Sequence, residues 1–173
     1  MLKNTEQVKK NITDQIKEAQ LKLGFVRETM RLYYPLESLN AMLGTSLENP
    51  QAMCEELFKE CSSFSFGVHQ GRIEVSVPAD FVAYVHRNVP TPPFLKALIE
   101  LFQNNHHLSL VQLEETFAEF GSYVCQKMPE EADFDYVMYF EDPAIDEYYY
   151  CIKMEMGHTI YHRFLQADYK KML

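Results

Sequence analysis

The sequence lacks any hydrophobic run long enough to cross a membrane, because no uninterrupted apolar stretch exceeds five residues, as at Phe81–Val85. A membrane-spanning helix needs about 20 such residues, so we expect no integral membrane protein. Residues 1–22 are polar and contain no signal-peptide core. The 173 residues are 47% hydrophobic and 24% charged, a globular composition that excludes wholesale disorder. We therefore expect a cytoplasmic protein with one domain or two very small ones.

Motifs that carry chemistry are also missing. The four cysteines form no C-x-x-C pair, which argues against a zinc knuckle or a redox pair and favours free, buried thiols in a reducing compartment. The six glycines are scattered, so there is no glycine-rich phosphate loop, and no G-x-S-x-G elbow occurs. No serine or cysteine lies in a nucleophile signature. The sequence thus favours a protein without catalytic activity and without a cofactor, although spatial triads stay open.

Positive charge is scarce in one part of the chain. The net charge is −9, and Val111–Glu147 holds eleven of the 25 acidic side chains with a single lysine. Such a stretch repels phosphate, which disfavours nucleic acid and anionic membranes as partners. It suits a basic protein partner, while a solvated face is the simplest interpretation. Residues 1–24 are different, with five lysines and three acids.

Hydrophobic periodicity predicts alternating helices and strands in the first half. Residues 4–23 have the spacing of an amphipathic helix, with Asn4 as its N-cap, Gln7 at the capping-box position and Gly24 as its stop. The expected elements are helix 4–23, strand 28–34, helices 35–43 and 50–61, and a hairpin over 64–77. This order of elements is that of a winged helix-turn-helix.

The second half has a similar but not identical pattern. The expected elements are helices 79–88, 92–102 and 110–120, a short helical turn at 122–128, a hairpin over 134–156, a strand 158–164 and a terminal helix 165–173. We expect an α+β fold, mainly helical with two antiparallel hairpins, and tandem winged-helix-like units are one form of it. The proline-rich segment 89–93 suggests domains at 1–88 and 89–173, with one compact domain as the alternative.

Two stretches resemble an uncharacterised bacterial protein family of about this length. They are residues 28–43 (ETMRLYYPLESLNAML) and 134–164 (FDYVMYFEDPAIDEYYYCIKMEMGHTIYHRF). The resemblance implies no established activity and no known catalytic residues.

The tip of the second hairpin is the candidate partner-binding surface. It combines acidic side chains with tyrosines, which are favoured at protein interfaces because the ring is apolar and the hydroxyl polar. The candidates are Glu141, Asp142, Asp146, Glu147, Tyr149, Tyr161 and Arg163. On a strand, Tyr149 points away from its neighbours, so its ring either is displayed beside the acids or packs under a second covered face of the sheet. The acids lack the ordered spacing of a calcium loop.

Histidine pairs are the weak candidates for a metal site. His158 and His162 have the spacing of two ligands on a helix, but the glutamate of a zinc protease is absent. On a strand they would lie about 13 Å apart and could not hold one ion. His106 and His107 fall in an expected loop, where they could respond to pH.

Three functions follow, in order of support. The first is an acidic cytoplasmic protein-interaction or assembly domain. The second is a small-ligand-binding protein or enzyme with a pocket near His158–Arg163. The third is a winged-helix DNA-binding regulator, which is disfavoured because the candidate reading helices 50–61 and 110–120 are rich in glutamate. Homo-oligomerisation stays open.

Overall fold

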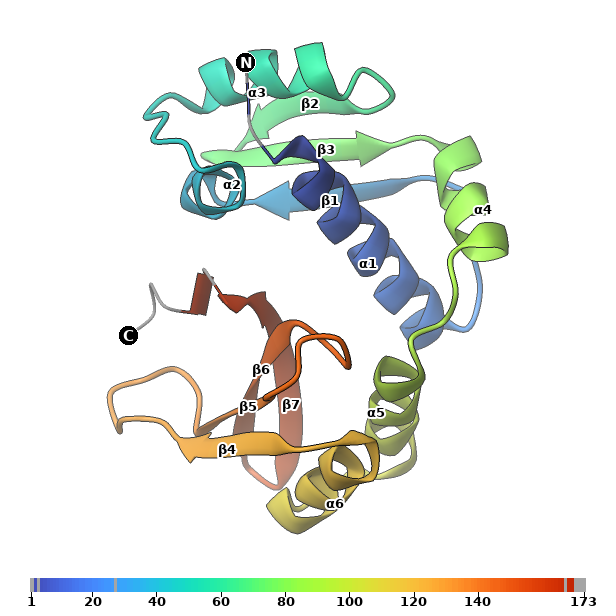
Figure 1. Ribbon diagram of the computed structural model, residues 1–173, viewed down its shortest axis with the longest axis vertical. Coiled ribbons are helices and arrows are strands. Elements are labelled where there is room, and N and C mark those ends of the chain that lie inside the picture. The colour runs from blue at the N-terminus through green and yellow to red at the C-terminus, as the bar shows by residue number, and fades with distance from the viewer. Residues whose placement is uncertain (1, 3, 27, 167, 170–173) are drawn as a thin grey trace. The chain divides into compact units, whose positions relative to one another are not determined.

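The computed structural model describes residues 2, 4–26, 28–166, 168 and 169. The chain forms two compact units, Met1–Pro90 (unit 1) and Thr91–Leu173 (unit 2). Each unit combines helices with one antiparallel sheet, as expected for an α+β fold (Figure 1). Within the described residues, no helix has both the length and the apolar character that crossing a membrane requires.

Unit 1 has the element order that the sequence predicts. Its elements are α1 (Thr5–Leu23), β1 (Met30–Tyr34), α2 (Leu36–Leu43), α3 (Pro50–Glu60), β2 (Ser65–His69), β3 (Arg72–Val77) and α4 (Ala79–Asn88). The prediction of helix, strand, two helices and a hairpin over residues 4–77 is confirmed. The three strands form a sheet in the order β1-β3-β2, so β1 pairs with the second strand of the hairpin.

The hairpin of unit 1 turns at Gln70 and Gly71, both with positive φ. Two such residues match the right-handed twist of the strands, which is why a glycine is needed there. One face of the sheet packs into the core with Ile73, Val75 and Val77, all buried. The opposite face carries polar side chains and is described below.

Helix α1 lies over the core with a continuous apolar stripe. Val8, Ile12 and Ile16 are completely buried, and Gly24 ends the helix in the left-handed conformation. The predicted cap is wrong: Asn4 makes no side-chain cap hydrogen bond, because its own φ of 63° places it outside the extended conformation that capping needs.

A polar network crosses this core between α1 and β1. Tyr34, which is buried, donates from its hydroxyl to Asn11 Oδ1 at 2.7 Å, and Gln15 Nε2 donates to the Tyr34 hydroxyl at 3.1 Å. Burial, with the nearby charge of Asp14, raises the pKa of Tyr34 far above its ordinary value. The network satisfies polar atoms that would otherwise be costly to bury.

Helix α3 buries a narrower face than the sequence predicts. Asn49 caps it by accepting from the Gln51 N–H, and Met53, Cys54 and Leu57 are buried as expected. Phe58, which lies four residues after Cys54 and is therefore expected on the same apolar face by helical spacing, is instead 56% exposed.

Unit 2 places two helices before four strands, an element order different from that of unit 1. Its elements are α5 (Pro93–Asn104), α6 (Leu110–Phe120), β4 (Tyr123–Lys127), β5 (Tyr136–Phe140), β6 (Tyr148–Glu155) and β7 (His158–Leu165). The strands form an antiparallel sheet in the order β4-β5-β6-β7. Ser109 and Gln112 form a capping box at the start of α6, as the S-x-x-Q spacing before an apolar run predicts.

One local prediction for unit 2 is wrong, and the start of a second predicted element is displaced by one residue. The segment 122–128 is not a helical turn but contains β4, because its alternating side chains pair in register with β5. The predicted terminal helix begins one residue later than expected: Leu165 ends β7, and Gln166, Asp168 and Tyr169 are helical. The rest of its predicted range lies outside the described residues.

The sheet of unit 2 is covered on both faces. On one face, Phe94 of α5 packs edge-on against Phe117, Phe140 and Tyr150 with ring centroids 4.7–5.4 Å apart. On the other face, a second cluster is built around four buried residues. They are Met128, Val137, Cys151 and Tyr169.

Candidate interaction surface

Strand β7 is an edge strand of the four-stranded sheet. It is eight residues long and pairs with β6 along its whole length, from Glu155↔His158 to Tyr148↔Leu165. Its sequence, HTIYHRFL, contains no proline, no acidic residue and a single arginine. Prolines and charged side chains normally prevent an edge strand from pairing with another chain. Strand β7 has only the one arginine for this purpose.

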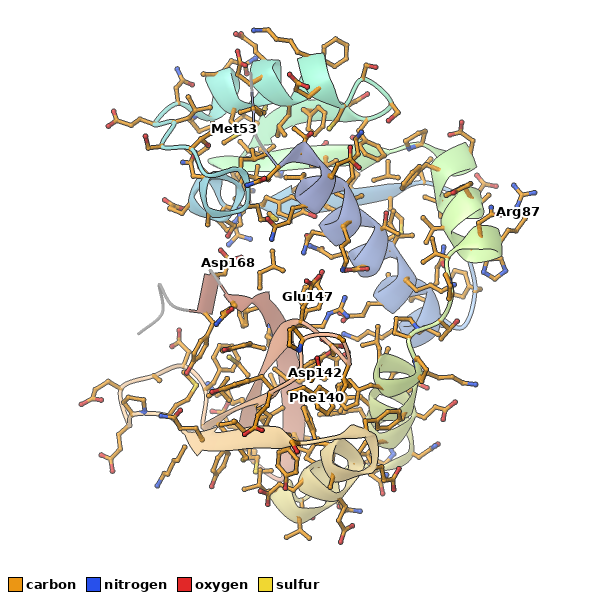
Figure 2. The ribbon with its side chains drawn as sticks, in the orientation of Figure 1. Met53, Arg87, Phe140, Asp142, Glu147 and Asp168 are labelled. Carbon is orange, nitrogen blue, oxygen red and sulfur yellow. The ribbon has the colours of Figure 1, made fainter. Side chains whose placement is uncertain are left out.

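The acidic candidates lie in the loop between β5 and β6, next to the end of β7. Glu141, Asp142 and Glu147 are exposed, and Asp146 is half-buried. Figure 2 labels Asp142 and Glu147 within this loop. Because Tyr148 pairs with Leu165, the loop and the C-terminal end of β7 lie at the same edge of the sheet.

Hydrogen bonds hold the loop in one conformation. Asp142 Oδ1 accepts from the Ala144 N–H at 2.9 Å, and the Asp142 carbonyl accepts from the Ile145 N–H at 3.1 Å. Asp146 Oδ1 accepts from the Tyr148 N–H at 2.8 Å. The side chains of Asp142 and Asp146 therefore stabilise the loop conformation, whereas Glu141 contributes through its backbone N–H, which donates to the Ser122 carbonyl.

A buried tyrosine anchors the end of this loop. Tyr150 is fully buried and donates from its hydroxyl to Asp146 Oδ2 at 2.7 Å. Its pKa is raised well above the ordinary value, mainly by burial and then by the charge of Asp146, with Arg163 acting in the opposite direction. The Arg163 guanidinium lies 4.2 Å above the ring of Tyr148, a cation–π contact.

The two remaining tyrosine candidates pack within unit 2. Tyr149 stacks on Tyr139 with centroids 4.1 Å apart and rings nearly parallel, and Gln166 Nε2 donates to its hydroxyl at 3.2 Å. Tyr149 thus belongs to the second covered face, the alternative that we left open. Tyr161 packs against Phe102 and Tyr150, with centroids 5.0 and 5.8 Å away.

The histidines of β7 do not converge. The side chains of His158 and His162 are themselves exposed, with His158 stacked on His107 and His162 beside Phe134. In the described part of the chain, no three His, Cys, Asp or Glu side chains are grouped so that they could hold a metal ion. His107 Nδ1 donates to the Gly157 carbonyl at 2.6 Å, which ties its loop to the β6–β7 turn.

Sequence reasoning missed the residue that best marks the edge strand. Ile160 is 48% exposed on β7 although it is a large aliphatic side chain. The signal for it was the absence of acids and proline in residues 158–165, which indicates an edge that is not protected against pairing.

Comparison with known proteins places the chain in a family. Residues 5–173 match the family model described as "Domain of unknown function, E. rectale Gene description (DUF3877)". The chain belongs to this family. The resemblance to an uncharacterised family is therefore confirmed over nearly the whole DUF3877 chain. No curated protein and no solved structure matches it.

Proposed function

We propose that this chain is a cytoplasmic bacterial protein-interaction domain that binds an extended segment of a partner protein along β7. The observation that carries the proposal is the eight-residue edge strand without proline or acid. Adding a strand to a sheet edge supplies main-chain hydrogen bonds for affinity, while side-chain contacts on alternate residues supply specificity. The four free cysteines among the described residues support a reducing compartment.

The acidic loop supplies the specificity in this proposal. Glu141, Asp142 and Glu147 are exposed at the end of β7 where Leu165 pairs with Tyr148. Residues 91–173 hold 14 acidic and six basic side chains, so the partner segment should be basic at that end. The hydrogen bonds of Asp142 and Asp146 preorganise the loop, which lowers the entropy lost on binding.

Unit 1 supports a protein contact better than a DNA contact. Its element order is the one from which we predict a winged helix, in which α3 would be the reading helix. The solvent side of α3 carries Glu55, Phe58 and Lys59, and Lys59 is paired with Glu56 at 2.7 Å. A helix with this surface offers the phosphate backbone no net positive charge.

The alternative of a ligand pocket near His158–Arg163 receives less support. Tyr161 and Arg163, which would form its polar lining, each contact aromatic rings of their own unit. Those contacts are sufficient to explain why both side chains are half-buried.

The test is selection of peptides from a displayed random library against the complete chain. We expect micromolar peptides with alternating apolar residues and a basic end, and we expect them to slow amide hydrogen exchange in β7. Ile160→Lys adds a charge to the edge and should weaken binding at least tenfold. Val111→Lys is the matched control, because Val111 is 61% exposed on α6 and is also β-branched.

A second pair of variants tests the acidic loop. Glu141→Lys should weaken the binding of the selected peptides about threefold to tenfold. The effect should be larger at low salt, because salt screens the interaction between exposed charges. Glu119→Lys, at an exposed position on α6, makes the same charge change away from the loop. Equal effects of Ile160→Lys and Val111→Lys, or exchange protection outside β7, would refute strand addition.

A further inference from the structure

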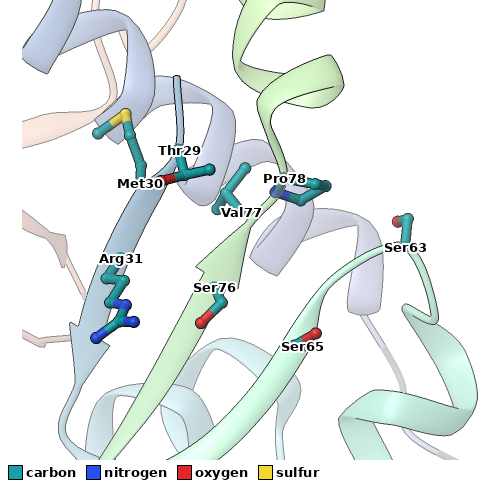
Figure 3. A pocket seen from close by; sticks show the side chains of 8 residues that line it. All are labelled: Thr29, Met30, Arg31, Ser63, Ser65, Ser76, Val77 and Pro78. Carbon is teal, nitrogen blue, oxygen red and sulfur yellow. The ribbon is translucent and has the colours of Figure 1, made fainter. Parts of the chain in front are cut away.

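The outer face of the three-stranded sheet in unit 1 holds a cavity of about 250 Å³. Figure 3 shows its side chains at the start of β1, before and at the start of β2, and at the end of β3. The lining residues are Thr29, Met30, Arg31, Ser63, Ser65, Ser76, Val77 and Pro78. The cavity opens to solvent, because Arg31, Ser63 and Ser65 are exposed.

The lining has the chemistry of an anion site. It contains four hydroxyl groups and one guanidinium, and no carboxylate. Hydroxyl groups can donate to an anion, and a guanidinium donates two parallel N–H bonds to a phosphate or carboxylate. We propose that this cavity binds the phosphate group of a small phosphate monoester.

Strand register is the reason that these groups converge. Arg31 of β1 pairs with Ser76 of β3, and Ser76 pairs with Ser65 of β2, so the three residues form one row across the sheet. Residues directly opposite one another on neighbouring strands point to the same face. Their neighbours Val75 and Val77 are buried on the core face, which places the row on the outer face.

The guanidinium of Arg31 retains the capacity to bind a ligand. Its side chain is 69% exposed, and its nearest carboxylate is Glu74, with Nε and Oε1 separated by 4.0 Å. That separation is beyond hydrogen-bond distance. Glu74 therefore acts mainly as a local negative charge that an incoming anion must overcome.

The size and charge of the surroundings favour a small phosphorylated molecule. A cavity of about 250 Å³ exceeds the volume of a phosphate group, which leaves space for the rest of a monoester. Residues 1–90 hold ten basic and 11 acidic side chains, so no broad positive field would attract a nucleic acid. The four hydroxyls and the guanidinium offer more hydrogen-bond donors than the two oxygens of a carboxylate can accept. The three terminal oxygens of a phosphate monoester can accept more of these hydrogen bonds.

The start of α4 adds a small positive potential near the cavity. Pro78 lines the cavity and α4 begins at the next residue, where the first N–H groups of a helix have no intrahelical acceptor. Asp80 lies in this first turn and its Oδ1 accepts from the Phe81 N–H, which reduces the positive potential.

The experiment is an NMR titration of the complete chain with inorganic phosphate and with phenyl phosphate at pH 8. Both ligands should give saturable shifts of the backbone amides in residues 29–31, 63–65 and 76–78, and phenyl phosphate should bind more tightly. Arg31→Gln should weaken binding at least tenfold. Arg72→Gln, which removes a charge from the same face outside the cavity, should change it less than twofold.

A gain of affinity gives the sharpest test. Glu74→Gln removes the opposing charge and should tighten phosphate binding about threefold to tenfold. Shifts that do not saturate, equal effects of Arg31→Gln and Arg72→Gln, or acetate binding as tightly as phosphate would each overturn the proposal. Circular dichroism of each variant excludes unfolding as the cause. The result is independent of the β7 proposal, which concerns unit 2.

Discussion

Removal of the Tyr150 hydroxyl should destabilise unit 2 while leaving its packing intact. In Tyr150→Phe, the ring still contacts Phe94 and Phe117, so the change removes only the polar contacts of the hydroxyl, chiefly the hydrogen bond to Asp146 Oδ2 beside the contact with Arg163. A hydrogen bond to a charged group contributes about 1.5–3 kcal/mol to stability. Asp146 is only half-buried and can be partly hydrated after the change, so we expect a loss of about 2 kcal/mol.

Tyr123→Phe is the matched control for this experiment. The Tyr123 hydroxyl also faces a carboxylate, Glu114 Oε1, but at 3.4 Å, which is too long for a strong hydrogen bond. We expect that variant to lose less than about 0.5 kcal/mol, since a bond outside the usual distance range contributes little.

Urea unfolding measures both variants. For a slope of about 2 kcal/mol per molar urea, Tyr150→Phe should lower the midpoint by about 1 M. Hydrogen exchange of β6 peptides assigns the loss to unit 2, which is needed because two units can unfold separately. Equal midpoints for Tyr150→Phe and Tyr123→Phe would refute the reasoning, as would a loss of exchange protection confined to unit 1.

Two further predictions concern the same unit. Gly157→Ala should lower the free energy of unfolding by about 1–2 kcal/mol, because its φ is 77° and an added Cβ would lie 3.2 Å from His107 Nδ1. Gly71→Ala, which has the same φ but open space around the added Cβ, should lower it less in the same urea unfolding experiment. Burial raises the pKa of Cys151 from 9.0 to about 11, so its neutral thiol stabilises the fold fully below pH 9 and that contribution is lost between pH 9 and 11. Denaturation of Cys151→Ala across this range should show a shallower pH dependence; an unchanged slope would contradict the assignment.

The order of elements could be predicted where local signals are strong. Gly24 ends α1 as predicted, and Asn49 and Ser109 cap α3 and α6, all through chemistry that acts within a few residues. Strand β4 was missed because the segment is short and its strand character comes from pairing with β5, a contact outside any local window. Asn4 failed as a cap because capping depends on backbone conformation as well as residue type.

The two candidate sites show the same limit. The acidic loop could be found from composition, but the different roles of its acidic side chains could not. Asp142 and Asp146 stabilise the loop conformation, which only their hydrogen bonds reveal. The phosphate cavity could not be found at all. Arg31 and Ser76 are 45 positions apart in the sequence and become neighbours through the register of β1 and β3.

The stacked pair of Tyr139 and Tyr149 gives this chain a built-in optical reporter. The sequence has no tryptophan, so tyrosine supplies its absorption at the long-wavelength end of the near ultraviolet, while phenylalanine absorbs at shorter wavelengths. Two rings 4.1 Å apart and within 4° of parallel couple their electronic transitions, and that coupling contributes to the near-ultraviolet circular dichroism only while the rings stay together. The signal lost in Tyr139→Leu therefore follows the second face of the unit 2 sheet directly, without any attached dye.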